Sequence, residues 1–165
     1  MRKLLFISVV LLAGCGGKLS DEQRKKMKDE MNKHKIVQIS DSEIVSSALD
    51  QGRRIFSTLE KLKGDSSRID SLASANYIKI SWVTPGSSKA AVLEQQLIDA
   101  YISGLVTGSL QDNIQKIHNS ENPGAYDSLV YSKPVVTPRP DGVENLEGVW
   151  NIYLSKKQVI LASGK

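Results

Sequence analysis

A short apolar run at the N-terminus, ending at the chain's only cysteine, constrains this sequence more than any other feature. Residues 4–12 are apolar apart from one serine, and Arg2 and Lys3 precede them. Ala13 and Gly14 are the small residues that a signal peptidase accepts before its cleavage site. Because a membrane-spanning helix needs roughly 20 apolar residues, this run is too short to be one. We therefore expect residues 1–14 to be a signal peptide and the remainder to work outside the cytoplasm.

The order Leu12-Ala13-Gly14-Cys15 resembles the lipobox of bacterial lipoproteins. The resemblance implies that the Cys15 thiol carries a diacylglycerol and becomes the N-terminus after cleavage, so that membrane lipid is the first partner. The alternative is a plain signal peptide with an incidental cysteine. Gly16 stands where Asp would retain such a protein in the inner membrane. Gly16 at this position implies attachment to the outer membrane, facing the periplasm. The acidic residues after residue 20 leave exposure at the cell surface as an alternative.

Lipidation of Cys15 leaves no thiol for a disulfide, so the fold has to depend on a hydrophobic core. The formal charge of +4 falls to +2 once Arg2 and Lys3 are removed. The basic isoelectric point is therefore no sign of nucleic-acid binding. About 150 residues remain, enough for one domain and a tether. We expect a basic helical tether over residues 15–39 and a single domain over residues 40–165.

Two capping boxes predict helix starts, one from Ser20 to Gln23 in the tether and one from Ser40 to Glu43 in the domain. The second should begin a helix that ends before residue 64, in which Gly52 marks close packing. Apolar spacing predicts further helices over residues 67–77 and 89–105 and a short one over 110–117. Residues 77–83 fit either a strand or a helix.

The C-terminal third predicts two strands, over residues 129–136 and 146–154, paired as an antiparallel hairpin. Pro134 should lie at a sheet edge or beside a bulge. The expected fold is α+β, with several helices packed on a small antiparallel sheet. On the second strand Trp150 shares the face of Ile152 and Leu154, so we expect it in the core, whereas Tyr153 points to the other face, which we expect to be wet.

The motif Ala48-x-x-x-Gly52-x-x-Ile55, together with residues 129–135 and 148–152, resembles a family of bacterial extracytoplasmic domains that are similar to PAS-like sensor modules. The resemblance covers residues 44–160 and implies a PAS-like fold. Some members bind haem c through a Cys-x-x-Cys-His motif, which would fall within residues 137–142. That interval has neither cysteine nor histidine, so we expect no haem and no other cofactor.

Aromatic residues of the hairpin are the candidate ligand-binding residues: Tyr131, Trp150 and Tyr153. The alternative places them in the core or on a wet sheet face. His34 and His118 have no metal ligand at a suitable spacing, and no catalytic motif is present, so we expect neither a metal nor catalysis. The sequence favours a lipid-anchored cell-envelope domain, sensor-like or binding a small ligand or an envelope protein. An envelope enzyme with an unrecognised site and a purely structural lipoprotein remain the alternatives.

Overall fold

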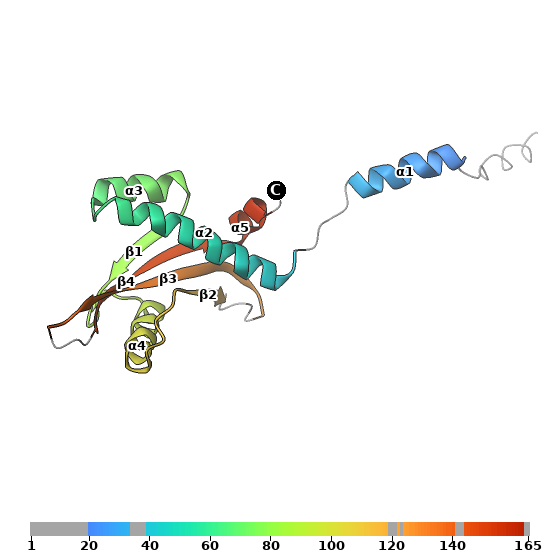
Figure 1. Cartoon of the computed structure of the whole chain (residues 1–165). Coiled ribbons are helices and arrows are strands. Elements are labelled where there is room, and N and C mark those ends of the chain that lie inside the picture. The colour runs from blue at the N-terminus through green and yellow to red at the C-terminus, as the bar shows by residue number, and fades with distance from the viewer. Residues whose placement is uncertain (1–19, 34–38, 119–121, 123, 141–143, 164–165) are drawn as a thin grey trace, which may run out of the picture. The chain divides into compact units, whose positions relative to one another are not determined.

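The computed structural model describes residues 20–33, 39–118, 122, 124–140 and 144–163 (Figure 1). The chain divides into two compact units, residues 1–38 and residues 39–165. The predicted signal peptide and Cys15 lie outside the described residues, as do His34 and the central residues of the hairpin turn. Within the described ranges, no helix has the length and apolar character needed to cross a membrane.

The first unit contains the helix α1 (Asp21–Lys33). Its predicted capping box is confirmed, because the Ser20 backbone N–H donates to Gln23 Oε1 at 3.0 Å and the Gln23 N–H donates to Ser20 Oγ at 3.2 Å. Side chains from residue 21 to residue 30 are exposed, including Met27. Over residues 21–30, where side-chain burial is described, α1 therefore buries no apolar side chain.

The second unit is an α+β domain built on one antiparallel sheet, as predicted. Its elements follow in the order α2 (Asp41–Lys61), α3 (Ser66–Ala75), β1 (Lys79–Val83), α4 (Val92–Thr107), β2 (Asn113–His118), β3 (Tyr126–Pro138), β4 (Glu144–Ser155) and α5 (Lys156–Ser163). The strands lie in the order β1-β4-β3-β2, and each neighbouring pair is antiparallel. The predicted C-terminal hairpin is the pair β3 and β4 at the centre of this sheet.

Residues 79–83 form a strand, β1. The sequence of residues 77–83 fitted either a strand or a helix, and the strand is correct for residues 79–83. The helix predicted over residues 110–117 is wrong, because residues 113–118 form β2 and pair with β3. Ile114 and Ile117 are three residues apart, a spacing that fits one helix face, but pairing with the long strand β3 prevails over it. The apolar tail after residue 155 is α5, which inserts the fully buried Val159 into the core.

Pro134 lies beside a bulge, as predicted. It pairs with Val149, and the register between β3 and β4 shifts directly afterwards, between Val135 and Val136. The pairing between β2 and β3 begins only at Ser132. Proline has no backbone N–H to donate. No described residue of β2 pairs with β3 at Pro134, so no hydrogen bond from Pro134 is needed on that side.

The helix α2 covers one face of the sheet and anchors the larger apolar cluster. Its predicted capping box at Ser40 and Glu43 is confirmed, with the Ser40 N–H donating to Glu43 Oε2 at 2.8 Å. One stripe of α2 is buried and packs on side chains from β3, β4 and α5. The cluster comprises Ile44, Ala48, Ile55, Phe56, Leu59, Tyr126, Leu129, Tyr131, Ile152, Leu154 and Val159.

Gly52 is the point of closest approach between α2 and the sheet. A Cβ atom at this position would lie 2.3 Å from Cγ of Tyr131, far inside van der Waals contact. The predicted close packing is therefore real, and the partner is a tyrosine ring on β3. A residue larger than glycine would have to push the helix away from the sheet.

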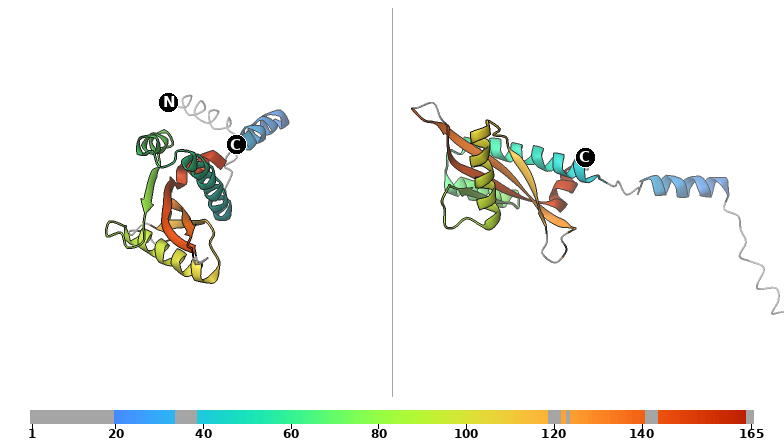
Figure 2. Two further views of the ribbon diagram at one scale, coloured as in Figure 1. Left: turned by 60° about the vertical axis from the view of Figure 1, so that its left-hand side comes forward. Right: turned by 90° about the horizontal axis from the view of Figure 1, so that it is seen from below.

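The opposite face of the sheet is covered by α4, while α2 and α5 lie on the other side (Figures 1 and 2). A second apolar cluster lies beneath α4 and comprises Val83, Leu97, Ile98, Tyr101, Val130, Leu146 and Val149, with Tyr153 packed against it. The expectation that the Tyr153 face is wet is therefore wrong. The alternation of side chains along a strand predicts the sheet face on which each residue lies. It does not predict whether helices cover one face of the sheet or both.

Candidate functional site

The structure distributes the three predicted aromatic residues over both faces of the sheet. Tyr131 is almost fully buried beneath Gly52, and Trp150 is half-buried on the same face. Tyr153 lies on the opposite face, under α4. The three side chains therefore do not line one common pocket, and a binding site has to be formed by other groups.

Trp150 stacks against Trp82 of β1, with ring centroids 4.9 Å apart. The two residues are direct partners in the pairing of β1 and β4. Gly148 makes room for the Trp82 indole, since a Cβ atom there would lie 2.4 Å from it. Trp82 remains 38% exposed. The two tryptophans therefore lie at the edge of the α2 face and are partly exposed to solvent. Trp150 is less buried than the alternation of its strand predicts.

Tyr131 is held by a carboxylate at the edge of the sheet. Its hydroxyl donates to Asp112 Oδ2 at 3.0 Å, and Arg53 donates to both oxygens of the same carboxylate, at 2.7 and 2.9 Å. The hydrogen bonds from Arg53 hold the pKa of Asp112 below its usual value, while burial and this carboxylate raise the pKa of Tyr131. Arg53, Asp112 and Tyr131 together join α2 to the sheet. Their hydrogen-bonding atoms already have partners within this cluster.

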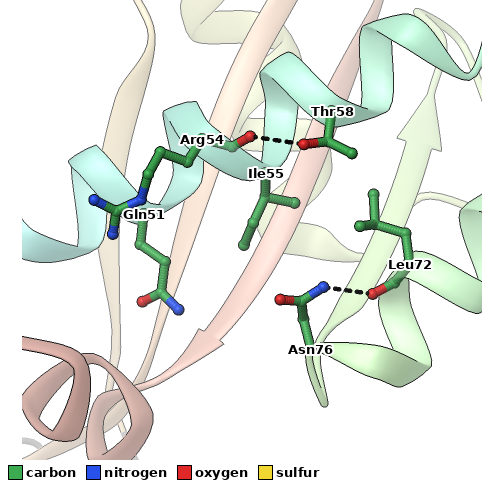
Figure 3. A pocket seen from close by; sticks show the side chains of 6 residues that line it. All are labelled: Gln51, Arg54, Ile55, Thr58, Leu72 and Asn76. Atoms are coloured by element: carbon green, nitrogen blue, oxygen red, sulfur yellow. Dashed lines mark hydrogen bonds between the residues drawn. The ribbon is translucent and has the colours of Figure 1, made fainter.

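A groove of about 260 Å³ separates α2 from α3 on the same side of the sheet (Figure 3). Ile55 and Leu72 form its apolar walls, one from each helix. Polar groups surround them, with Gln51, Arg54 and Thr58 from α2 and Asn76 from the end of α3. An apolar groove with a few converging polar groups is the usual form of a small-molecule site.

Two of these polar side chains are partly committed to the helix backbone. Thr58 Oγ1 donates to the Arg54 carbonyl at 3.2 Å, and Asn76 Nδ2 donates to the Leu72 carbonyl at 2.9 Å (Figure 3). Gln51 differs, because its Oε1 atom is buried and accepts no hydrogen bond from the described part of the chain. A buried acceptor without a donor costs about 1–3 kcal/mol, and a bound molecule that brought a donor to this atom would remove that cost.

A second set of polar groups is buried between α4 and the sheet. Glu94 of α4 is only 5% exposed, and its Oε1 atom accepts hydrogen bonds from Ser81 and Tyr153, each at 2.7 Å. Its Oε2 atom accepts the Ala91 backbone N–H at 3.0 Å. Burial raises the pKa of Glu94, but the three hydrogen bonds together outweigh burial and leave the pKa below its usual value.

We use the term polar seam for this set and its continuation across the sheet: Ser81, Glu94, Tyr101, Asn151, Ser132 and Tyr153. At its far end the Tyr101 hydroxyl lies 2.7 Å from Ser132 Oγ and donates to the Ser132 carbonyl at 3.0 Å. Burial raises the pKa of Tyr101 to about 12. The seam puts hydroxyl, amide and carboxylate groups where the other face of the sheet has apolar side chains.

The ranges that the structure covers contain no cluster of candidate metal ligands. No group of three or more histidine, cysteine or acidic side chains is placed there to hold an ion. His118 is exposed, and its ring lies 6.2 Å from that of Tyr126. What these groups can do chemically is to donate and accept hydrogen bonds.

Sequence reasoning missed Gln51, Glu94 and Asn151 as interior polar groups. Each lies among residues whose apolar spacing predicts the element correctly, and nothing in a single sequence distinguishes a polar residue at an interface from one in solvent. The capping-box position of Glu94, three residues into α4, was the one signal that could have found it, since its side chain does accept the backbone N–H of residue 91.

Protein-family models, curated proteins and solved structures give no match to this chain. The lipobox and the PAS-like resemblance therefore stay predictions that rest on the residues quoted for them. Any function has to be inferred from the groove and the polar seam themselves.

Proposed function

We propose that this chain is a lipid-anchored protein of the bacterial cell envelope whose domain binds a small molecule in the groove between α2 and α3. The binding role rests on one observation, the buried and unpartnered Oε1 atom of Gln51. The anchor rests on Leu12-Ala13-Gly14-Cys15, and the absence of Asp after Cys15 favours the outer membrane facing the periplasm. In this proposal the domain senses or carries its ligand and performs no reaction on it.

The groove suggests the ligand's chemistry. Gln51 Oε1 requires an N–H or O–H donor, and the guanidinium of Arg54 favours a carboxylate or another anionic group. Ile55 and Leu72 offer apolar contact in the same groove. A small amphiphilic acid with a neighbouring N–H group, such as an N-acylated amino acid, satisfies all three requirements.

The anchor is tested by replacing the lipidated thiol. We expect Cys15→Ser to yield a protein that is unprocessed or moves from the detergent phase to the aqueous phase in a phase-partitioning experiment, because a hydroxyl does not replace the thiol as the acyl acceptor. If the Ser variant enters the detergent phase as the parent does, the lipoprotein proposal is wrong.

The groove is tested with a matched pair of ligands, N-acetyl-leucine and its uncharged amide, by calorimetric titration of the parent chain. We expect the acid to bind more tightly than the amide, and Arg54→Gln to remove the difference. Gln51→Leu should weaken both ligands about tenfold, the effect of one lost hydrogen bond of 1.4 kcal/mol. Arg68→Gln on the exposed side of α3 is the control. Equal binding of both ligands to all variants, or no binding at all, would reject the groove as the site.

A further inference from the structure

The polar seam contains an anomaly that its structural role does not explain. Asn151 is 0% exposed, and neither its Oδ1 nor its Nδ2 atom has a hydrogen-bond partner in the described part of the chain. A buried amide without partners is costly, because both its donors and its acceptor have lost water. An apolar side chain of similar size would fit this position between β1 and β3 without that cost.

The neighbours of Asn151 are also polar. In the register of the sheet it pairs with Ser81 of β1 on one side and with Ser132 of β3 on the other. Residues that are direct partners in neighbouring strands point to the same face, so the three side chains form a row beneath α4. Ser81 is engaged by Glu94 and Ser132 by Tyr101, which leaves the amide at the centre of the row.

A groove of about 310 Å³ runs beside α4 and ends at one of these residues. Its lining includes Leu97, Ala100 and Tyr101 of α4 and Asp112 and Asn113 at the start of β2. Tyr101 thus stands between the groove and Ser132, the direct neighbour of Asn151. A molecule in this groove would reach the unpaired amide only if the Tyr101 hydroxyl left Ser132.

The attachment of α4 is suited to such a movement. Among the strands, α4 mainly contacts β4. Gly108 caps the C-terminus of α4 with a left-handed φ of 67°, and the segment that leads into β2 begins there. Ile102 and Val106 on its outer side are exposed, so no other described element holds it from outside. Because Leu97 and Ile98 are buried in the second apolar cluster, the opening requires the Tyr101 side chain to move rather than the whole helix.

From these observations we infer that the groove beside α4 is a second binding site, gated by Tyr101, for a small neutral molecule that carries both hydroxyl and amide groups. Asp112 is the one charged residue among those that line the groove, and its pairing with Arg53 leaves little net charge to attract either an anion or a cation. Hydroxyl groups match Ser132 and Tyr101, whereas an amide matches both halves of Asn151. The volume lies at the lower end of the range for small-molecule sites. This inference does not depend on the anchor or on the groove between α2 and α3.

The probe is N-acetylglucosamine, which presents an acetamido group and several hydroxyls, titrated into the whole chain purified in detergent. The readout is the NMR signal of the Asn151 side-chain amide, identified by its loss in Asn151→Leu. We expect a saturable shift of this signal and of the Ser132 backbone amide, at least tenfold weaker binding to Asn151→Leu, and no shift with the anion glucuronate. An Asn151 signal that stays in place, or that moves equally with glucuronate, would overturn the inference.

Tyr101→Phe separates a gate from a merely structural residue. It keeps the ring but removes the hydroxyl that closes on Ser132, so we expect N-acetylglucosamine to bind several-fold more tightly. Tyr153→Phe removes the matching hydroxyl at the other end of the seam, away from the residues that line this groove, and should leave the affinity unchanged. Unchanged or weaker binding to Tyr101→Phe, or the same gain in both variants, would contradict the gate.

Discussion

The two faces of the sheet are covered in opposite ways. On the α2 face the contact is apolar and so close that only glycine fits at residue 52, where the helix meets the Tyr131 ring. On the α4 face an apolar patch surrounds a row of serine, asparagine, tyrosine and glutamate side chains. One strand, β4, supplies both faces, with Ile152 buried on the first and Asn151 on the second.

The two faces therefore differ in the kind of side-chain contact that holds their helices. Apolar burial stabilises the fold by roughly 25 cal/mol per Å², and it is concentrated under α2. Buried polar groups add little net stability when paired and subtract from it when unpaired. A polar seam under α4 is therefore a poor means of holding a helix in place but a suitable one for binding a polar molecule. We therefore expect the α2 face to contribute more of the free energy of folding and α4 to open at a lower cost in free energy.

The largest expected effect is on the α2 face. Ile152→Ala removes a fully buried side chain from the centre of the larger cluster, and we expect a loss of about 2–5 kcal/mol in the free energy of unfolding. Leu161→Ala on α5, where the side chain is 67% exposed, is the control and should change little. Denaturant titration measures both. A loss below about 1 kcal/mol for Ile152→Ala, on the order of a surface change, would mean that the α2 face does not hold the fold.

The next effect concerns the contact between Gly52 and Tyr131. In an exposed helix position Gly→Ala is stabilising by up to about 1 kcal/mol. Here we expect Gly52→Ala to destabilise by about 1–3 kcal/mol, because the new methyl group overlaps the Tyr131 ring. The double variant Gly52→Ala with Tyr131→Ala should show strong favourable coupling, since the ring is then absent.

Ser46→Ala, at an exposed position of the same helix, controls for helix propensity in this test. If Gly52→Ala proves as benign as Ser46→Ala, the helix does not approach the Tyr131 ring closely enough to exclude a methyl group.

A smaller effect is expected on the α4 face. Glu94→Gln keeps one acceptor but loses the charge that strengthens the hydrogen bonds from Ser81 and Tyr153, at a cost of about 1 kcal/mol. Because the folded-state pKa of Glu94 lies below its ordinary value of 4.5, its contribution is fully present above pH 4.5 and is lost as the pH falls through the folded-state pKa. The parent and the variant should therefore differ near neutrality and converge in acid. A difference that grows as the pH falls would contradict this assignment.

Much of the fold could be predicted from residues alone. Capping boxes, apolar spacing and strand alternation predict α2, the central hairpin, the bulge at Pro134 and the side of β4 on which each residue lies. They do not predict β2, because two isoleucines three residues apart fit one face of a helix, whereas in β2 Ile114 and Ile117 lie on opposite faces of the sheet. They also fail to show that α4 covers the Tyr153 face, because that depends on how the chain returns over the sheet between β1 and β2.

The candidate sites were less predictable than the fold. Aromatic residues attract attention in a sequence, yet Tyr131 is a packing residue and Trp150 faces away from Tyr153. Gln51 and Asn151 are conspicuous only once their surroundings are known, since an unpaired amide is a property of three-dimensional burial. Helices and strands bring these polar residues into the interior of the domain, and of Gln51, Glu94 and Asn151 a short motif marks only Glu94.

Native-state hydrogen exchange on the whole chain tests most directly whether the two faces differ. It measures the opening free energy of each backbone amide. We expect amides in α2, β3 and β4 to exchange only through global unfolding, and those of α4 from residue 95 to residue 105 to exchange together through a smaller opening. If the α4 amides are as strongly protected as those of α2, α4 is a fixed part of the core and the proposed division between a stable face and a movable one is wrong.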